Sequence, residues 1–162
     1  MPDAGDLLAV ARSLVAAPGP SDAALRRAVS TGYYALFHAV LREAAARFAD
    51  EGSAAHALIY RAFEHGQMRA VCEAVDRDAL ADRWARALGR RSVSRDARDF
   101  AGAFVVAQER RMAADYDPRA SFYPSDVRNG LDEVGRALDA FARVAPGERA
   151  DLLALLMVRA RG

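Results

Sequence analysis

The sequence predicts an all-α protein, and three observations support this class. Long segments carry apolar residues at helical spacing, no segment alternates apolar and polar residues convincingly as a half-buried strand would, and the strongest chain breakers fall between the periodic segments. At 162 residues, the chain is long enough to form one domain with a buried core. We therefore expect a helical bundle that spans residues 1–162 as a single domain.

Helix-breaking and helix-capping residues set the order of the elements. Pro18-Gly19-Pro20 ends the first helix, Ser21 caps the second, and Gly52 ends it. Further along, Asp117-Pro118 stops a long helix because proline disfavours helical geometry in the residue before it, and Pro146-Gly147 precedes the last one. The expected helices span residues 4–16, 21–50, 53–75, 79–88, 94–116, 125–144 and 148–161.

Two of these expected helices have features that bear on the architecture. Gly66 is a weak point inside the helix over 53–75. The terminal helix is too apolar for a solvated tail, so it packs either on its own bundle or on another subunit. Its large apolar residues are Leu152, Leu153, Leu155, Leu156 and Val158. This second alternative is one reason to expect a homodimer.

The composition limits the kinds of ligand and the cellular location that we expect. The formal net charge is +1 and all basic residues are arginine, so binding of nucleic acid by bulk charge is not expected and would need a local patch. The single cysteine, Cys72, excludes an internal disulfide, and its valine neighbours indicate a buried small hydrophobe. The sequence has no signal peptide and no apolar run long enough to span a membrane. We expect a cytoplasmic protein.

A line of polar groups follows one face of the second helix. At about 100° per residue, Arg27, Thr31, Tyr34 and His38 lie within roughly 60° of one another, with Ser30 at the edge. The opposite arc of this helix is apolar. A guanidinium, a hydroxyl, a phenol and an imidazole in register can receive a phosphate, a base or a carboxylate from a neighbouring helix.

A second polar cluster lies at the end of the helix over 94–116. Arg111 continues an apolar stripe, Gln108 and Asp115 lie beside it, and Tyr116 follows where the helix ends. Arg111 and Asp115 are four residues apart and can pair. We expect Tyr34 and His38 to approach this pair. Either the groups form a functional site, or Arg111 ties Asp115 to the second helix and fixes helix register without any ligand.

A third set consists of Arg61, His65 and Arg69, which follow one another at four-residue steps in the expected helix over 53–75. This basic line can bind phosphate, or it can be a solvated helix face. His56, near the start of the same helix, is expected at the surface.

Catalytic templates that depend on metals or cofactors are missing. The sequence has no CxxC or HExxH motif, no phosphate loop or dinucleotide fingerprint, and no Glu-x-x-His pair for a di-iron bundle. It also lacks the GxSxG elbow of serine hydrolases. No metal or cofactor is expected.

Two segments resemble the HEPN family of helical domains. The segment at 27–38, Arg-Ala-Val-Ser-Thr-Gly-Tyr-Tyr-Ala-Leu-Phe-His, is similar to the Ser-Arg-Ala-Tyr-Tyr-Ala-x-Phe-His helix of one HEPN branch. The segment at 108–118 is similar to its Gln-x-x-Arg-x-x-Ala-Asp-Tyr-Asp-Pro segment, and residues 61–72 resemble a third, weaker signature. The resemblance implies an antiparallel HEPN-like bundle to which the terminal helix is an extra element.

Membership of the HEPN family would imply a homodimer and a role in toxin–antitoxin, defence or RNA-processing systems. Many members are metal-independent ribonucleases, and others are noncatalytic partners of a nucleotidyltransferase. The ribonuclease motif has four to six residues between arginine and histidine, whereas Arg61 and His65 have three between them, and Met112 follows Arg111 where a polar residue would strengthen the cluster. This departure favours a noncatalytic module that binds RNA or a nucleotide.

Two alternatives stay open beside the noncatalytic module. In a metal-independent ribonuclease, the candidate catalytic residues are His38, Arg111, Asp115, Tyr34 and Arg27, with a histidine as general acid or base and an arginine against the developing phosphorane charge. In a purely structural module, the same residues hold a protein partner such as an antitoxin. In either binding case, the candidate ligand-binding residues are Arg61, His65, Arg69, Thr31, Gln108 and Tyr116.

Overall fold

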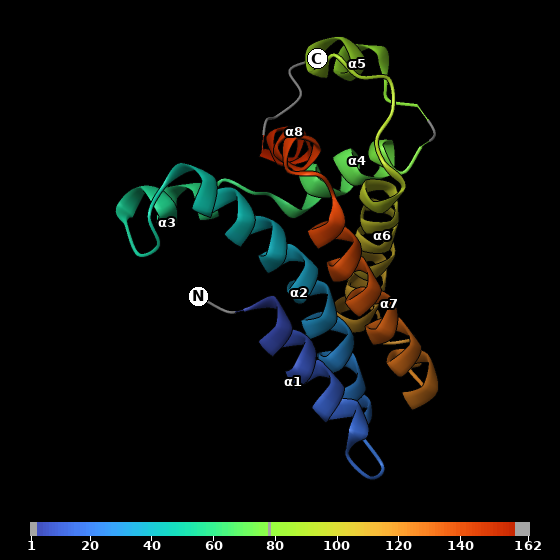
Figure 1. The fold of residues 1–162 in the computed structure, drawn as a ribbon. Helices are drawn as coiled ribbons and strands as arrows, with labels where there is room; N and C mark the ends of the chain where they lie inside the picture. The colour runs from blue at the N-terminus through green and yellow to red at the C-terminus, as the bar shows by residue number, and fades with distance from the viewer. Residues whose placement is uncertain (1–2, 78, 158–162) are drawn as a thin grey trace. The chain divides into compact units, whose positions relative to one another are not determined.

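Every secondary-structure element in the described part of the chain is an α-helix, which confirms the predicted all-α class (Figure 1). The computed structural model describes residues 3–77 and 79–157. The helices are α1 (Ala4–Ala16), α2 (Asp22–Phe48), α3 (Ala54–Tyr60), α4 (His65–Val75), α5 (Asp82–Leu88), α6 (Arg95–Tyr116), α7 (Pro124–Arg143) and α8 (Pro146–Met157). The expectation that the last helix continues to residue 161 lies partly outside the described residues.

Local chemistry at the breakers explains most of these boundaries. Ser21 caps α2 as expected, since its Oγ accepts a hydrogen bond from the amide of Ala24 at 3.2 Å. Gly19, Gly52 and Gly89 have φ values of 60°, 85° and 67°, in the left-handed region that a glycine enters without steric cost. The chain therefore turns where the sequence predicts it.

The expected helix over 53–75 is wrong, because the chain breaks between Tyr60 and His65 and forms α3 and α4 instead. In a straight helix, Phe63 would lie roughly 130° away from the stripe that Met68, Val71 and Cys72 bury, and would face solvent. The break allows Phe63 to be buried, with 7% of its surface exposed. Burial of the phenyl ring contributes about 1.5–3 kcal/mol, which offsets the interrupted helical hydrogen bonds at about 0.5–1.5 kcal/mol each.

The chain's contacts divide it into two compact units, each built from two segments of sequence. Among the described residues, the first unit comprises 3–39 and 103–139, and the second comprises 40–77, 79–102 and 140–157. Three helices, α2, α6 and α7, contribute residues to both units. The prediction of a single domain stays a prediction.

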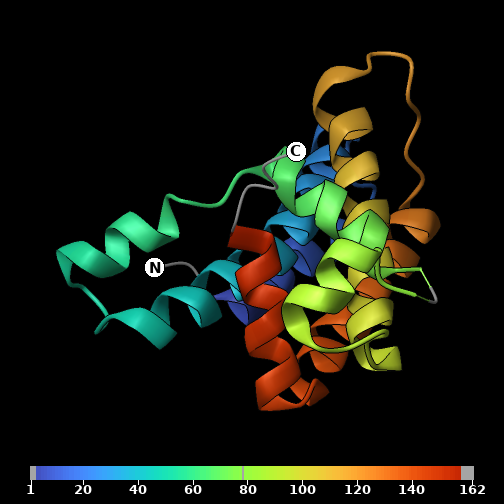
Figure 2. The ribbon, with the colours of Figure 1, turned by 90° about the horizontal axis from the view of Figure 1, so that it is seen from above.

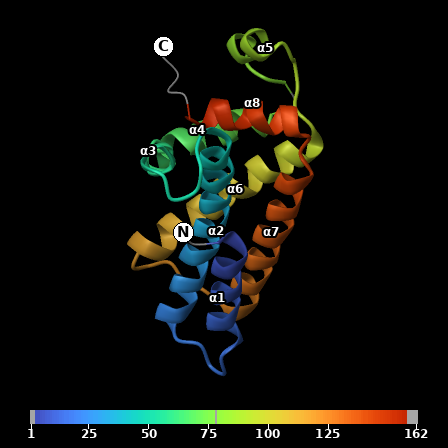
Figure 3. The ribbon, with the colours of Figure 1, turned by 60° about the vertical axis from the view of Figure 1, so that its left-hand side comes forward.

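In the first unit, α1 lies beside the first half of α2, and α7 packs against both (Figures 1 and 3). Gly32 of α2 allows the close approach to α7, because a Cβ at this position would lie 2.7 Å from a methyl group of Leu131. Arg12 of α1 pairs with Asp132 of α7 at 3.2 Å. A tyrosine of α2, Tyr33, packs edge-on against Phe104 of α6, with ring centroids 5.4 Å apart.

In the second unit, α8 packs against α4 (Figures 2 and 3). Leu152, Leu153 and Leu156 are buried there, with at most 2% of their surfaces exposed. The carboxylate of Glu148 accepts a hydrogen bond from the amide of Ser94 at 2.6 Å and pairs with Arg90 at 3.2 Å. The terminal helix is therefore part of its own chain's core, and its leucines offer no support for the expected dimer.

The expected surface position of His56 is wrong, because the side chain is buried. It is 4% exposed in α3, where its ring lies over that of Tyr60 with centroids 6.4 Å apart. The sequence predicts a surface position because a lone histidine near a helix start is usually solvated. Stacking on an aromatic ring one turn later gives the imidazole a covered position.

Candidate functional site

The polar residues of α2 and the end of α6 meet within the first unit, as the sequence predicts. Ser30 donates a hydrogen bond from its hydroxyl to a carboxylate oxygen of Asp115 at 3.3 Å. One turn further along α2, the hydroxyl of Tyr34 accepts a hydrogen bond from the guanidinium of Arg111 at 3.2 Å. The two helices run antiparallel, because the later residue of α2, Tyr34, meets the earlier residue of α6, Arg111.

Arg111 is the centre of this arrangement, which we call the Arg111 cluster: Ser30, Tyr34, Arg111, Asp115 and Tyr116. The guanidinium lies 2.8 Å from a carboxylate oxygen of Asp115. Its central carbon lies 5.7 Å from the ring centre of Tyr34 and 5.4 Å from that of Tyr116, within cation–π range of both rings. Only 14% of the Arg111 side chain is exposed, whereas Tyr116 is 65% exposed.

The electrostatics of the Arg111 cluster keep Arg111 charged. Partial burial lowers the pKa of Arg111, but the electrostatic interactions with Tyr34, Asp115 and Tyr116 and the hydrogen bond to Tyr34 raise it by more, so the pKa lies above its ordinary value. The guanidinium is therefore a permanent cation at physiological pH. Asp115 is the carboxylate that balances this charge.

The remaining candidates on α2 and α6 differ in how far they are buried. The His38 ring lies beside Tyr34, with centroids 6.2 Å apart, and is half-buried. Thr31 is also half-buried, Arg27 is exposed, and Gln108 is 6% exposed. Of the candidate catalytic residues, the structure thus joins Tyr34 and Asp115 through Arg111, with His38 beside Tyr34.

The expected basic line of Arg61, His65 and Arg69 is wrong as a continuous helical face. Arg61 follows the last residue of α3, and His65 opens α4 after the break that buries Phe63. Arg69 pairs with Glu73 of its own helix at 2.6 Å. The four-residue steps that suggested one face do not apply across two helices.

Sequence reasoning missed Arg26, the neighbour of Arg27. Its guanidinium donates hydrogen bonds to the carbonyl oxygens of Ala114 at 3.1 Å and Asp117 at 2.9 Å, and it also reaches that of Ala120. Arg26 also pairs with Asp22 of its own helix at 2.6 Å. The signal that identifies its role is the Asp117-Pro118 helix end, whose last carbonyl groups need donors.

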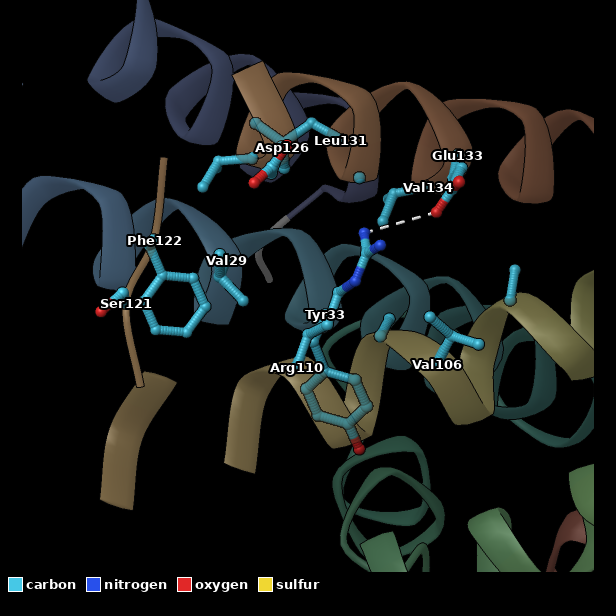
Figure 4. A pocket seen from close by; sticks show the side chains of 14 residues that line it. Val29, Tyr33, Val106, Arg110, Ser121, Phe122, Asp126, Leu131, Glu133 and Val134 are labelled. Atoms are coloured by element: carbon cyan, nitrogen blue, oxygen red, sulfur yellow. Dashed lines mark hydrogen bonds and ion pairs between the residues drawn. The ribbon is translucent and has the colours of Figure 1, made fainter. Parts of the chain in front are cut away.

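A cavity in the first unit was also missed. It has a volume of about 290 Å³ and lies between α2, α6, α7 and the segment 117–123 (Figure 4). Its residues, such as Val29, Phe122 and Leu131, are scattered apolar positions that each look like ordinary core. No local sequence pattern marks a cavity of this kind, because its walls come from segments far apart in the chain.

The described residues contain no reactive cysteine, no metal-binding group and no membrane-spanning helix. Burial, with the nearby charges of Asp76 and Glu73, raises the pKa of the Cys72 thiol well above its ordinary value, so this cysteine is not a nucleophile. Within residues 3–77 and 79–157, no three His, Cys, Asp or Glu side chains gather where they could hold a metal ion. None of the described helices is both long and apolar enough to cross a bilayer.

The fold and the cluster define an all-helical protein with a guanidinium held between two tyrosine rings and a carboxylate. No protein-family model matches the chain, and comparisons with curated proteins and with solved structures gave no match.

Proposed function

We propose that this protein is a noncatalytic, HEPN-type module of a toxin–antitoxin or defence system, and that it binds single-stranded RNA at the Arg111 cluster. The observation that carries the proposal is the layered arrangement of Tyr116, Arg111 and Tyr34. An exposed tyrosine backed by a guanidinium is a platform on which an unpaired base can stack.

The charge balance of the cluster favours binding over cleavage. Cleavage of RNA without a metal needs a cation that faces the developing phosphorane charge and a base at the 2′-hydroxyl. Here the cation, Arg111, is largely covered and already faces Asp115, and Arg61 and His65 lie on separate elements. Arg27, exposed on the same face of α2 as Tyr34, is placed to contact a phosphate of the bound strand.

The direct test is the affinity of Tyr116→Ala for a fluorescently labelled, mixed-sequence single-stranded RNA, measured by anisotropy. Stacking of one base on an aromatic side chain contributes about 1–3 kcal/mol, so the variant should bind roughly 5- to 150-fold more weakly. Tyr116→Phe keeps the ring and should bind within about twofold of the unchanged protein.

Tyr123→Ala is the matched control, because Tyr123 is a tyrosine of the same unit with a similar exposure of 61%, and no part of the Arg111 cluster. Equal losses for Tyr116→Ala and Tyr123→Ala would contradict a specific platform. Absence of RNA and nucleotide binding in the unchanged protein would leave a structural role with a protein partner, such as an antitoxin.

The ribonuclease alternative is tested with the same RNA in the presence of a chelator. We expect the RNA to stay intact during incubation with the unchanged protein. Cleavage that disappears in His38→Ala, His65→Ala or Arg111→Ala would overturn the noncatalytic proposal. Cleavage that persists in all three variants would indicate a contaminating nuclease.

A further inference from the structure

The cavity in the first unit is separate from the Arg111 cluster and has the features of a ligand site. Its walls are predominantly apolar and come from four parts of the chain: Val29 and Tyr33 of α2, Val106 of α6, Phe122 of the segment 117–123, and Leu131 and Val134 of α7. At about 290 Å³, it lies at the lower end of the range for small-molecule sites. The Tyr33 hydroxyl points away from the α7 residues in Figure 4.

The wall formed by the segment 117–123 is held in place rather than loose. Arg26 lies over the ring of Phe122, with its central carbon 5.3 Å from the ring centre, and it donates hydrogen bonds to the carbonyl groups of Ala114 and Asp117. These bonds fix the segment against the end of α6. The cavity is therefore preformed, and a ligand would not need to order the chain in order to bind.

The charged groups of the cavity are two carboxylates and one guanidinium. Arg110 pairs with Glu133 at 3.4 Å, a contact between half-exposed side chains (dashed line in Figure 4). Asp126 adds a second carboxylate from the first turn of α7. Because the pair of Arg110 and Glu133 is neutral, the lining carries a net charge of −1 through Asp126. An anion would meet two carboxylates here, and a cation would be attracted.

We propose that this cavity binds a small organic cation: an amine carried on an aromatic or branched apolar body of one or two rings. The apolar body occupies the space between Val29, Phe122 and Leu131, and the ammonium group lies at Asp126. This site is independent of the RNA-binding proposal, because its lining shares no residue with the Arg111 cluster.

Two probes with the same ring system and opposite charge test the proposal. Tryptamine carries an ammonium group at neutral pH, whereas indole-3-propionate carries a carboxylate. Binding to the full chain is measured by titration, with amide chemical shifts in NMR spectra to locate it. We expect tryptamine to bind about tenfold more tightly than indole-3-propionate, with the largest shifts at Phe122 and Val127.

Two variants separate the contribution of the charge from that of the space. Asp126→Asn removes the unbalanced carboxylate from the surface of α7, so the preference for tryptamine should fall to within about threefold and lose its dependence on salt. Asp132→Asn is the matched control, since Asp132 is an exposed carboxylate of the same helix outside the cavity lining, and it should leave the preference unchanged. Ala103→Leu fills part of the cavity and should abolish binding of both probes.

Several outcomes would overturn the proposal. These are equal or tighter binding of indole-3-propionate, no binding of tryptamine at millimolar concentration, largest shifts outside the cavity lining, and an unchanged preference in Asp126→Asn. If Ala103→Leu fails to fold, its NMR spectrum will show this, and the Asp126→Asn comparison decides alone.

Discussion

Asp115 is the residue that limits the charge Arg111 can offer to a bound strand. The two groups are 2.8 Å apart, and Asp115 also accepts the hydrogen bond of the buried Ser30 hydroxyl. Asp115→Asn removes this negative charge and leaves a full cation beside the exposed Tyr116 ring. We predict tighter RNA binding at low salt. The slope of log affinity against log salt should steepen by about 0.7, the value for one additional phosphate contact on a single strand.

This prediction has a control of equal charge. Asp132→Asn also removes a paired carboxylate from the first unit and raises the net charge by the same amount, but its partner is Arg12 of α1. It should leave the salt slope within experimental error of the unchanged protein. Equal steepening in both variants would mean that net charge, and not Arg111, controls binding.

We also expect Asp115→Asn to lower the free energy of unfolding by about 1–3 kcal/mol, because Ser30 and Arg111 lose a partner.

At this scale, the sequence predicted contacts that depend on helical spacing alone. Tyr34 and Arg111 each lie inward on their own helix, and the structure joins them by a hydrogen bond. Sequence reasoning selected Arg27 and missed Arg26, since the two neighbours have the same chemistry and differ in the direction in which they leave α2. The position of the α6 end decides which of the two arginines donates hydrogen bonds to the last carbonyl groups of α6.

At the scale of elements, the end of α6 and the segment after it depend on Arg26. The last carbonyl groups of a helix have no partners within the helix, and Arg26 supplies donors to those of Ala114 and Asp117. Arg26→Ala should therefore lower the free energy of unfolding by about 2–3 kcal/mol and increase proteolysis in the segment 117–123. Chemical denaturation followed by circular dichroism, together with limited proteolysis, measures both effects.

Arg27→Ala provides the comparison for this prediction, because it removes the same side chain from the adjacent, exposed position. Its effect on unfolding should stay within about 0.5 kcal/mol. If Arg26→Ala were as mild as Arg27→Ala, the hydrogen bonds to the α6 end would not stabilise the fold. Binding of tryptamine should also weaken in Arg26→Ala, since Phe122 loses the contact that fixes it.

The helix boundaries show which elements a sequence can predict. Breaks at Gly19, Gly52 and Gly89 follow from local backbone geometry and were located correctly. The break between α3 and α4 was placed only as a weak point at Gly66, because its cause is the burial of Phe63 in the second unit. The cavity between α2, α6 and α7 likewise depends on packing between distant segments, and local spacing carries no information about it.

For the whole molecule, the remaining question is whether its two compact units unfold together, as the prediction of a single domain requires. Each unit is built from two separate segments of sequence, and α2, α6 and α7 continue from one unit into the other. Helix formation is cooperative along the chain, so melting of α2 in one unit removes the support for its residues in the other. Neither unit retains a complete set of helices if the other is lost.

Native-state hydrogen exchange measures this cooperativity directly. We predict that the slowest amides of α2 at 33–36 in the first unit and those of α4 at 68–72 in the second exchange with free energies that agree within about 1 kcal/mol. Both should fall together when denaturant is added, because both would report the same global opening. The destabilised Arg26→Ala variant adds a second check: its substitution lies in the first unit, yet it should lower both free energies equally. A drop confined to residues 33–36 would show instead that the units are separate domains.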